Sequence, residues 1–316
     1  MFDFKFKIKR TTQTAICMTD TSYSIATLSD DHRLLSHEYR EFTAKTIPTL
    51  ADSLISDAKR LHLIGQTCRL ILTPQQYQLV MMDALDVPET EMAKALKWRL
   101  KGLIDYPLND IAMDAFLVPP HGVANQQKKA FVAVTPLSKL RAKLALCAAA
   151  YIDIVEVGIT ELALGKLCSL LPLKRNAPII VISPEGHNAQ LHIFYHQQLY
   201  LVRALHLPIH VADENSDHQH STLLEIQRSM DHCQVTLKLP EPQAIYFTPG
   251  FGKATVLLHY LEQELQNLVH LIDLNELLSL TEPLSLHDQQ NLFYSIGGAL
   301  TVSDATTPLI HQEESI

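Results

Sequence analysis

Short apolar segments separated by aspartates open the chain after its first dozen residues. The segments 14–18, 22–28 and 33–42 are each long enough for one strand, and the aspartates between them favour tight turns. The pattern predicts a three-stranded meander, followed by a helix at 49–62 and a strand at 68–72.

The second half of the chain repeats this order of elements without obvious identity to the first half. Three strands are predicted at 179–183, 190–195 and 199–205, and a helix at 222–233. A meander that continues as alternating helix and strand is typical of a mixed sheet with helices packed against it. The sequence therefore predicts the same α/β architecture twice.

The first half carries an additional segment at about 75–135. Within it, Pro88 is expected at the first position of a helix, where its missing N–H costs nothing, and Gly102 is expected to close that helix. Strands are predicted on both sides of the helix. One apolar stripe along the helix is predicted to be buried: Met92, Leu96, Leu100 and Leu103.

The length of 316 residues favours two lobes, because single hydrophobic cores stop growing near ~250–300 residues. The boundary is expected within 171–176. The predicted first lobe is 1–173 with its insert, and the second lobe is 174–300. Residues 301–316 are polar and acidic without an apolar period, so we expect a disordered tail.

The formal net charge of −8 argues against a general affinity for nucleic acid phosphates, so no nucleic-acid partner is expected. The N-terminus is the exception. Lys5, Lys7 and Lys9 alternate there with apolar residues, which is typical of an edge strand. Weak contact with an anionic membrane face is the alternative.

Two further observations favour a cytoplasmic protein. The chain lacks a signal-peptide pattern, and no apolar run approaches the ~20 residues that cross a bilayer. The five cysteines are odd in number, widely spaced and free of C-x-x-C pairs, which is typical of a reducing compartment.

Four segments, in the order expected, resemble the MshI/PilM family of pilus-assembly proteins. The first contains the tryptophan and "LIDYP" pattern, the second an "EIQRS" helix, the third a late strand and turn, and the fourth a "Y-x-I-G-x-A-L" pattern. They are Leu96–Pro107, Glu225–Asp231, Ile245–Pro249 and Tyr294–Leu300.

This resemblance implies an actin-like ATPase (RNase H-like) fold of two lobes around a cleft, with the insert replacing a small subdomain of actin. It also implies a function, that of a cytoplasmic scaffold for a type IV pilus of the mannose-sensitive haemagglutinin kind. The expected partners are the cytoplasmic N-terminal segment of a PilN- or MshJ-like inner-membrane protein and the pilus assembly ATPase. Self-association is left open.

Actin-like ATPases hold ATP phosphates between two hairpins that usually carry Asp-x-Gly, because the carboxylate organises Mg²⁺ and the glycine admits backbone N–H groups to the phosphate. The first hairpin here, 16–22, and the second, 180–186, both lack that motif. Asp20 or Glu185 could replace a missing carboxylate. We expect a degenerate site with no cofactor and no catalytic residues, and retained ATP and Mg²⁺ binding as the alternative.

The resemblance also indicates where an adenosine would lie. A glycine pair follows the late strand, and the residues implied there are Gly250, Gly252 and Lys253. Glu225 and Arg228 lie on the helix that flanks the base in this group, and an ordinary surface pair at (i, i+3) is their alternative interpretation.

Trp98, the only tryptophan, lies off the apolar stripe of its helix. One interpretation is that it packs against the neighbouring subdomain. The other is that Trp98 and Arg99 help to bind the partner's peptide, since tryptophan and arginine are favoured interface anchors. The resemblance places the peptide groove between the insert and the adjoining lobe.

No metal site is expected, although the chain has 16 histidines. Zinc requires three or four convergent ligands, and the pairs His192/His196 and His206/His210 fall in predicted strands or loops. The dense segment 217–220 is interpreted as a solvated loop. Two functional alternatives remain, an active actin-like ATPase that controls pilus assembly and a component of a type II secretion platform.

Overall fold

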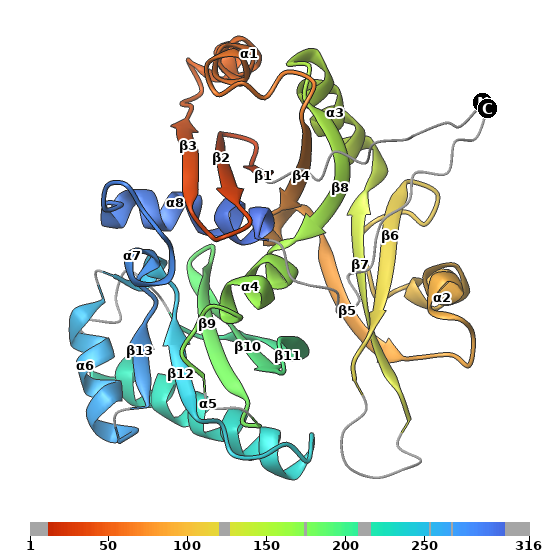
Figure 1. Ribbon diagram of the computed structural model, residues 1–316. Coiled ribbons are helices and arrows are strands. Elements are labelled where there is room, and N and C mark those ends of the chain that lie inside the picture. Colours follow the sequence, from red (N-terminus) through yellow and green to blue (C-terminus); the bar gives the residue numbers. More distant parts are fainter. Residues whose placement is uncertain are drawn as a thin grey trace, which may run out of the picture.

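Figure 1 shows a computed structural model of the chain, which describes residues 12–119, 127–173, 176–207, 216–252, 254–266 and 268–300. The basic N-terminal segment, the acidic tail, Lys253 and His210 lie outside these residues. Within the described part, no helix is both long and apolar enough to cross a membrane.

The first sheet has the strand order β3-β2-β1-β4-β8. The strands β1 to β3 form the predicted antiparallel meander, and β4 and β8 add to β1 in parallel. The strands are β1 (Thr12–Met18), β2 (Ser22–Ser29), β3 (Leu34–Glu41), β4 (Thr67–Leu72) and β8 (Asp153–Ile159).

The second sheet repeats this topology as β11-β10-β9-β12-β13, which confirms the predicted duplication. Again an antiparallel meander is extended by two parallel strands. The strands are β9 (Ile179–Glu185), β10 (Asn188–Tyr195), β11 (Gln198–Leu205), β12 (Ala244–Phe247) and β13 (Val269–Leu271).

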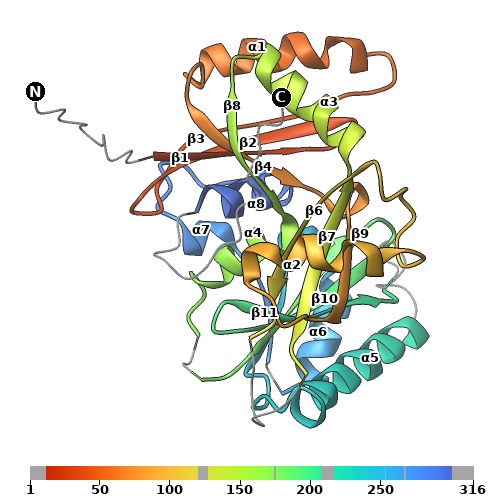
Figure 2. The ribbon, with the colours of Figure 1, turned by 90° about the vertical axis from the view of Figure 1, so that its right-hand side faces the viewer.

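Helices and sheets stack in five layers (Figures 1 and 2). Because side chains alternate along a strand, Ile16 of β1 faces the outer helices α1 and α3, whereas Ala15 faces inward. Helices α4 and α8 lie between the sheets, and α5 and α6 cover the far face of the second sheet. The helices are α1 (Leu50–Arg60), α3 (Leu137–Ala149), α4 (Thr160–Cys168), α5 (Ser216–Val235), α6 (Thr255–Glu264), α7 (Leu274–Leu277) and α8 (Leu286–Ala299).

The last helix, α8, packs against the first sheet although it lies at the end of the second half of the sequence. Two adjacent glycines permit its close approach. A Cβ at Gly298 would lie 2.5 Å from Cγ1 of Ile71 in β4, and one at Gly297 would lie 2.6 Å from the carbonyl oxygen of Ala163 in α4. The two halves are therefore interlocked in space, and the proposed lobe ranges remain a prediction of the sequence.

The insert is a three-stranded antiparallel sheet, β5-β7-β6, beside the stack, with α2 against β6 (Figure 2). Its elements are β5 (Gln78–Asp83), α2 (Glu89–Leu96), β6 (Ile111–Leu117) and β7 (Lys129–Pro136). Helix α2 ends at Leu96 rather than near Gly102, because the chain tightens into a 3₁₀ turn at Lys97–Leu100. That turn keeps Leu100 fully buried but leaves Leu103 56% exposed, so the predicted stripe was wrong at its last position.

Candidate functional site

The carboxyl ends of the parallel strands carry the turns at which ligands usually bind in α/β sheets. Strand β1 leads into the first hairpin turn there, and β9 leads into the second. Strand β12 ends beside them in a 3₁₀ turn at Pro249–Phe251. These turns contain most of the residues that the sequence singled out for a nucleotide.

The first hairpin turn satisfies its own backbone donors. The hydroxyl oxygen of Thr19 accepts hydrogen bonds from the N–H groups of Thr21, at 3.1 Å, and Ser22, at 2.9 Å. Those are donors that a phosphate-binding turn would offer to its ligand. Asp20 extends into solvent, 87% exposed, and its carboxylate lies 3.3 Å from Nζ of Lys143. These contacts disfavour phosphate binding at this turn.

The glycine pair after β12 packs against protein instead of offering open backbone. A Cβ at Gly250 would lie 2.3 Å from Cγ of Pro184 in the second hairpin. A Cβ at Gly252 would lie 2.5 Å from Cδ1 of Leu286, the first residue of α8. A side chain at either position would have to displace Pro184 or Leu286, so both glycines serve close packing in this structure.

A cavity of about 470 Å³, which we call the cleft cavity, lies between β5 of the insert and the second sheet. The polar and charged side chains that line it include Tyr77, Glu161, Glu185, Gln190 and Arg203. Two of these follow from the topology, since Glu161 lies in the first turn of α4, directly after β8, and Glu185 ends β9. The sequence pattern singled out Glu185 but missed Glu161.

Glu161 is the most perturbed carboxyl group at this edge. Its side chain is 1% exposed, its Oε2 accepts a hydrogen bond from the Tyr77 hydroxyl, and its Oε1 has no hydrogen-bond partner among the described residues. Burial raises the pKa of Glu161 to about 7, and the nearby Glu185 carboxylate adds to the rise, while the Tyr77 hydrogen bond opposes it. Near neutral pH this group is partly protonated, which weakens it as a ligand for Mg²⁺.

Glu225 and Arg228 line a second cavity, of about 330 Å³, that shares Arg203 with the cleft cavity. The carboxylate of Glu225 accepts a hydrogen bond from the backbone N–H of His206, at 3.1 Å, directly after the end of β11. Among the described residues no ion pair joins Glu225 to Arg228. The structure therefore places both residues beside the cleft, although the contacts of Glu225 serve to anchor the chain after β11.

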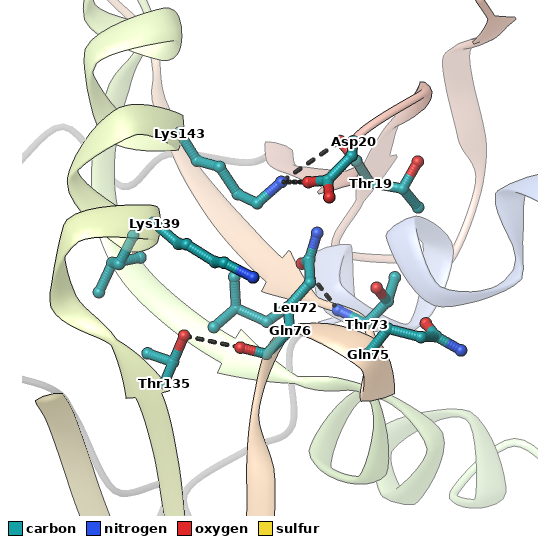
Figure 3. Close-up of a pocket in the computed structure, with 10 residues that line it drawn as sticks. Thr19, Asp20, Leu72, Thr73, Gln75, Gln76, Thr135, Lys139 and Lys143 are labelled. Atoms are coloured by element: carbon teal, nitrogen blue, oxygen red, sulfur yellow. Dashed lines mark hydrogen bonds and ion pairs between the residues drawn. The ribbon is translucent and has the colours of Figure 1, made fainter. Parts of the chain in front are cut away.

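A third cavity, of about 200 Å³, lies between the insert and the first lobe, and we call it the insert pocket (Figure 3). Helix α3 contributes Lys139 and Lys143, and the chain after β4 contributes Gln76. The Gln76 amide donates to the carbonyl oxygen of Met18, at 2.7 Å, and the hydroxyl of Thr135 donates to the carbonyl oxygen of Gln76, also at 2.7 Å. These bonds fix the pocket wall at the junction of the insert and the first sheet.

The two cations of the insert pocket differ in their contacts. Lys143 is buried and its Nζ lies 3.3 Å from both the carboxylate of Asp20 and the carbonyl oxygen of Thr19. Lys139 is exposed and, in the described part of the chain, forms no hydrogen bond or ion pair. Its ammonium group points into the pocket, toward the side chain of Gln76 (Figure 3). The pocket therefore presents one unpaired cation to a carbonyl or carboxylate group.

Trp98 and Arg99 do not line any of these three cavities. The Trp98 side chain is 76% exposed, so the interpretation that it packs against a neighbouring subdomain was wrong. The reason is the 3₁₀ turn, which buries Leu96 and Leu100 and directs the residues between them outward. A role in binding the partner's peptide stays a prediction.

The histidines form no metal site in the described residues, where no group of three or more His, Cys, Asp or Glu side chains could hold an ion. His192 is buried, and burial lowers its pKa to about 4. The segment 217–220, predicted as a loop, lies in the first turns of α5. Aspartate and histidine are weak helix formers, and the helix forms there because its later residues pack on the second sheet.

The sequence matches no protein-family model and no curated protein. Solved structures are similar at low identity. A PilM–PilN type IV pilus biogenesis complex superposes with a TM-score of 0.66 at 14% identity, over 91% of this chain and 97% of the other. A Bacteroides thetaiotaomicron protein with an actin-like ATPase fold and unknown function gives 0.53 at 10% identity, over 86% and 94%.

This chain has the actin-like fold. The predicted fold class is thereby confirmed. The cytoplasmic domain of EpsL, an inner membrane component of the type II secretion system of Vibrio cholerae, is similar over 90% of this chain and 94% of that domain, with 11% identity and a TM-score of 0.49. At 14% and 10% identity, the PilM–PilN complex and the Bacteroides protein show the fold alone.

Proposed function

We propose that this chain is a cytoplasmic scaffold of a type IV pilus assembly platform of the mannose-sensitive haemagglutinin kind. In this proposal its insert pocket binds the cytoplasmic N-terminal segment of a PilN- or MshJ-like inner-membrane protein, which recruits the scaffold to the inner face of that membrane. The scaffold then links the platform to the pilus assembly ATPase.

The observation that carries the proposal is the insert pocket. It lies between the insert and the first lobe, the region to which the family resemblance assigns the peptide groove. A PilM–PilN complex is among the solved structures with a similar fold, which supports the choice of partner. The ammonium group of Lys139 is suited to a peptide carbonyl or an acidic side chain, because a charged donor strengthens such a hydrogen bond.

Charge reversal at Lys139 tests this site. The ligand is the cytoplasmic N-terminal peptide of the PilN- or MshJ-like inner-membrane protein. Its affinity is measured for the unaltered full chain and for the variants Lys139→Glu and Lys59→Glu. Lys59 is exposed on α1 and is not one of the residues that line the pocket, so it controls for the change in net charge. We expect Lys139→Glu alone to weaken binding about tenfold, which is about 1.4 kcal/mol. Equal affinity of the two variants would place the peptide elsewhere.

The second part of the proposal is that the scaffold works without nucleotide. Two observations support it. The backbone N–H groups of the first hairpin turn already donate to the Thr19 hydroxyl oxygen, and Gly250 and Gly252 are packed against other side chains. Titration with a fluorescent ATP analogue and Mg²⁺, and the peptide affinity with and without ATP, provide the test. Saturable binding at micromolar concentration would overturn this part.

One observation favours the alternative of an active actin-like ATPase. The buried Glu161 and the half-buried Glu185 face the cleft cavity from the ends of their strands, where a catalytic carboxylate would be useful. Release of phosphate from ATP that is abolished by Glu161→Gln would support that alternative. The titration with the fluorescent ATP analogue, together with this assay of phosphate release, therefore separates the scaffold from the ATPase.

A further inference from the structure

A segment of the insert displays apolar and cationic side chains together. Between α2 and β6, Trp98 is 76% exposed and Leu103 is 56% exposed. Few large apolar side chains of the described residues are as open to solvent, and here two of them lie in one short segment. We call Lys97–Leu103 the exposed insert segment.

The charge around this segment has one sign. From residue 94 to residue 103 the sequence has four cations and no acidic residue, in a chain whose net charge is −8. The cations are Lys94, Lys97, Arg99 and Lys101. No ion pair in the described part of the chain involves Lys97, Arg99 or Lys101. The positive charge is therefore available to an external anionic partner.

The fold holds this segment in place. Leu96 and Leu100 are completely buried in the core of the insert, and the backbone N–H of Leu103 donates to the carbonyl oxygen of Leu100, at 2.9 Å. The next acidic residue, Asp105, is bound at 2.6 Å by the amide of Gln78, which keeps its carboxylate turned to β5. The display of Trp98 between cations is thus built into a packed turn.

We propose that the exposed insert segment docks on an anionic lipid surface. Tryptophan is favoured at the boundary between headgroups and acyl chains, and leucine adds buried apolar area. Lysine and arginine close to such a surface are attracted by its negative potential, by roughly fivefold in affinity for each cation. Charge complementarity selects this partner, because the segment that exposes Trp98 is cationic although the chain as a whole is acidic.

The inference goes beyond the peptide site and does not depend on it. The exposed insert segment shares only Leu103 with the cleft cavity and no residue with the insert pocket. A scaffold that holds a membrane protein's peptide in one place and the lipid surface in another would be fixed in orientation, because two contacts define an orientation that one contact leaves free.

The single tryptophan makes the test direct, since intrinsic tryptophan emission of the full chain reports on Trp98 alone. Vesicles of phosphatidylcholine with about 30% phosphatidylglycerol are compared with vesicles of phosphatidylcholine only, in flotation and in fluorescence. We expect binding and a blue shift of the emission with the anionic vesicles only, with both lost at high salt. Absence of binding to the anionic vesicles would overturn the proposal.

Variants distinguish this segment from other basic parts of the chain. The triple variant K97E/R99E/K101E should lose roughly a hundredfold in vesicle affinity, and Trp98→Ala roughly tenfold. The matched control K45E/K59E/R141E reverses three exposed cations elsewhere and should lose at most a few-fold. Equal losses in the two triple variants, or vesicle binding that survives K97E/R99E/K101E, would refute the assignment.

One more comparison separates a lipid surface from a protein partner. If the peptide occupies the insert pocket, whose lining does not include Trp98, the affinity of Trp98→Ala for the cytoplasmic peptide should be unchanged. The sequence-based prediction that Trp98 binds the peptide requires a weaker affinity instead. An emission shift that appears with the peptide alone and not with anionic vesicles would overturn the lipid assignment and make the segment a peptide site.

Discussion

Replacing Glu161 by glutamine should change how the stability of the protein depends on pH. Burial raises the folded-state pKa of this carboxyl group from an ordinary value near 4.5 to about 7. Between these values the folded chain binds more protons than the unfolded chain, so the free energy of unfolding falls as pH rises. The free energy of unfolding falls by about 3 kcal/mol in total, and the decrease is complete above about pH 7. A glutamine keeps the shape and the acceptor for Tyr77 but does not titrate.

Thermal unfolding of the unaltered chain and Glu161→Gln between about pH 5 and about pH 8 measures this effect. The Tm of the variant, relative to that of the unaltered chain, should increase by roughly 5 °C as pH rises over that range. Glu91→Gln, on the exposed side of α2, controls for loss of one carboxylate and should follow the unaltered chain at every pH. Parallel curves for all three proteins would show that Glu161 is not a neutral-range titrating group, and the reasoning from its burial would fail.

Two further predictions concern packing and buried charge. Gly298→Ala should lower the free energy of unfolding by about 2 kcal/mol, because its Cβ would lie 2.5 Å from Cγ1 of Ile71. Helix propensity alone predicts that alanine stabilises the helix. Urea unfolding of the two proteins distinguishes these expectations. Asp57→Asn should cost about 2–3 kcal/mol, because the fully buried carboxylate accepts hydrogen bonds from the hydroxyl of Tyr23, at 2.7 Å, and from Arg40 Nη2, at 2.9 Å. A loss below about 1 kcal/mol in the same assay would contradict that estimate.

The strands and their order in each half could be predicted from the sequence. The turns of the first meander are marked by aspartate, and the later strands are short, mainly apolar segments, as at 68–72 and 243–247. Local pattern is sufficient for such elements. The position of α8 is different, because Leu292 and Ile296 make the helix apolar without saying which sheet it covers. That depends on contacts across more than two hundred residues of sequence, such as Gly298 against Ile71.

The candidate site was harder to predict than the fold. Glu161 lies in the first turn of a mainly apolar helix directly after a strand, and the pattern analysis passed over it. The resemblance assigned Gly250 and Gly252 to a nucleotide, and in the structure the atoms that approach them are those of Pro184 and Leu286. Sequence alone does not distinguish a glycine that admits a ligand from one that admits a side chain. Trp98 shows the reverse error, since its apolar character favoured burial and its cationic neighbours argued against it.

The contacts between the sheets have a consequence for lobe motion. Helix α4 meets the second sheet through Gly165, whose Cβ would lie 3.2 Å from the carbonyl oxygen of Gln197, and it meets α8 through Gly297. Helix α8 in turn meets the first sheet through Gly298. Closure of the cleft around a nucleotide would shear at least one of these contacts, and tightly packed interfaces resist gradual displacement. Such contacts favour a fixed arrangement of the two sheets, which is what a scaffold with a peptide on one side and a lipid surface on another requires.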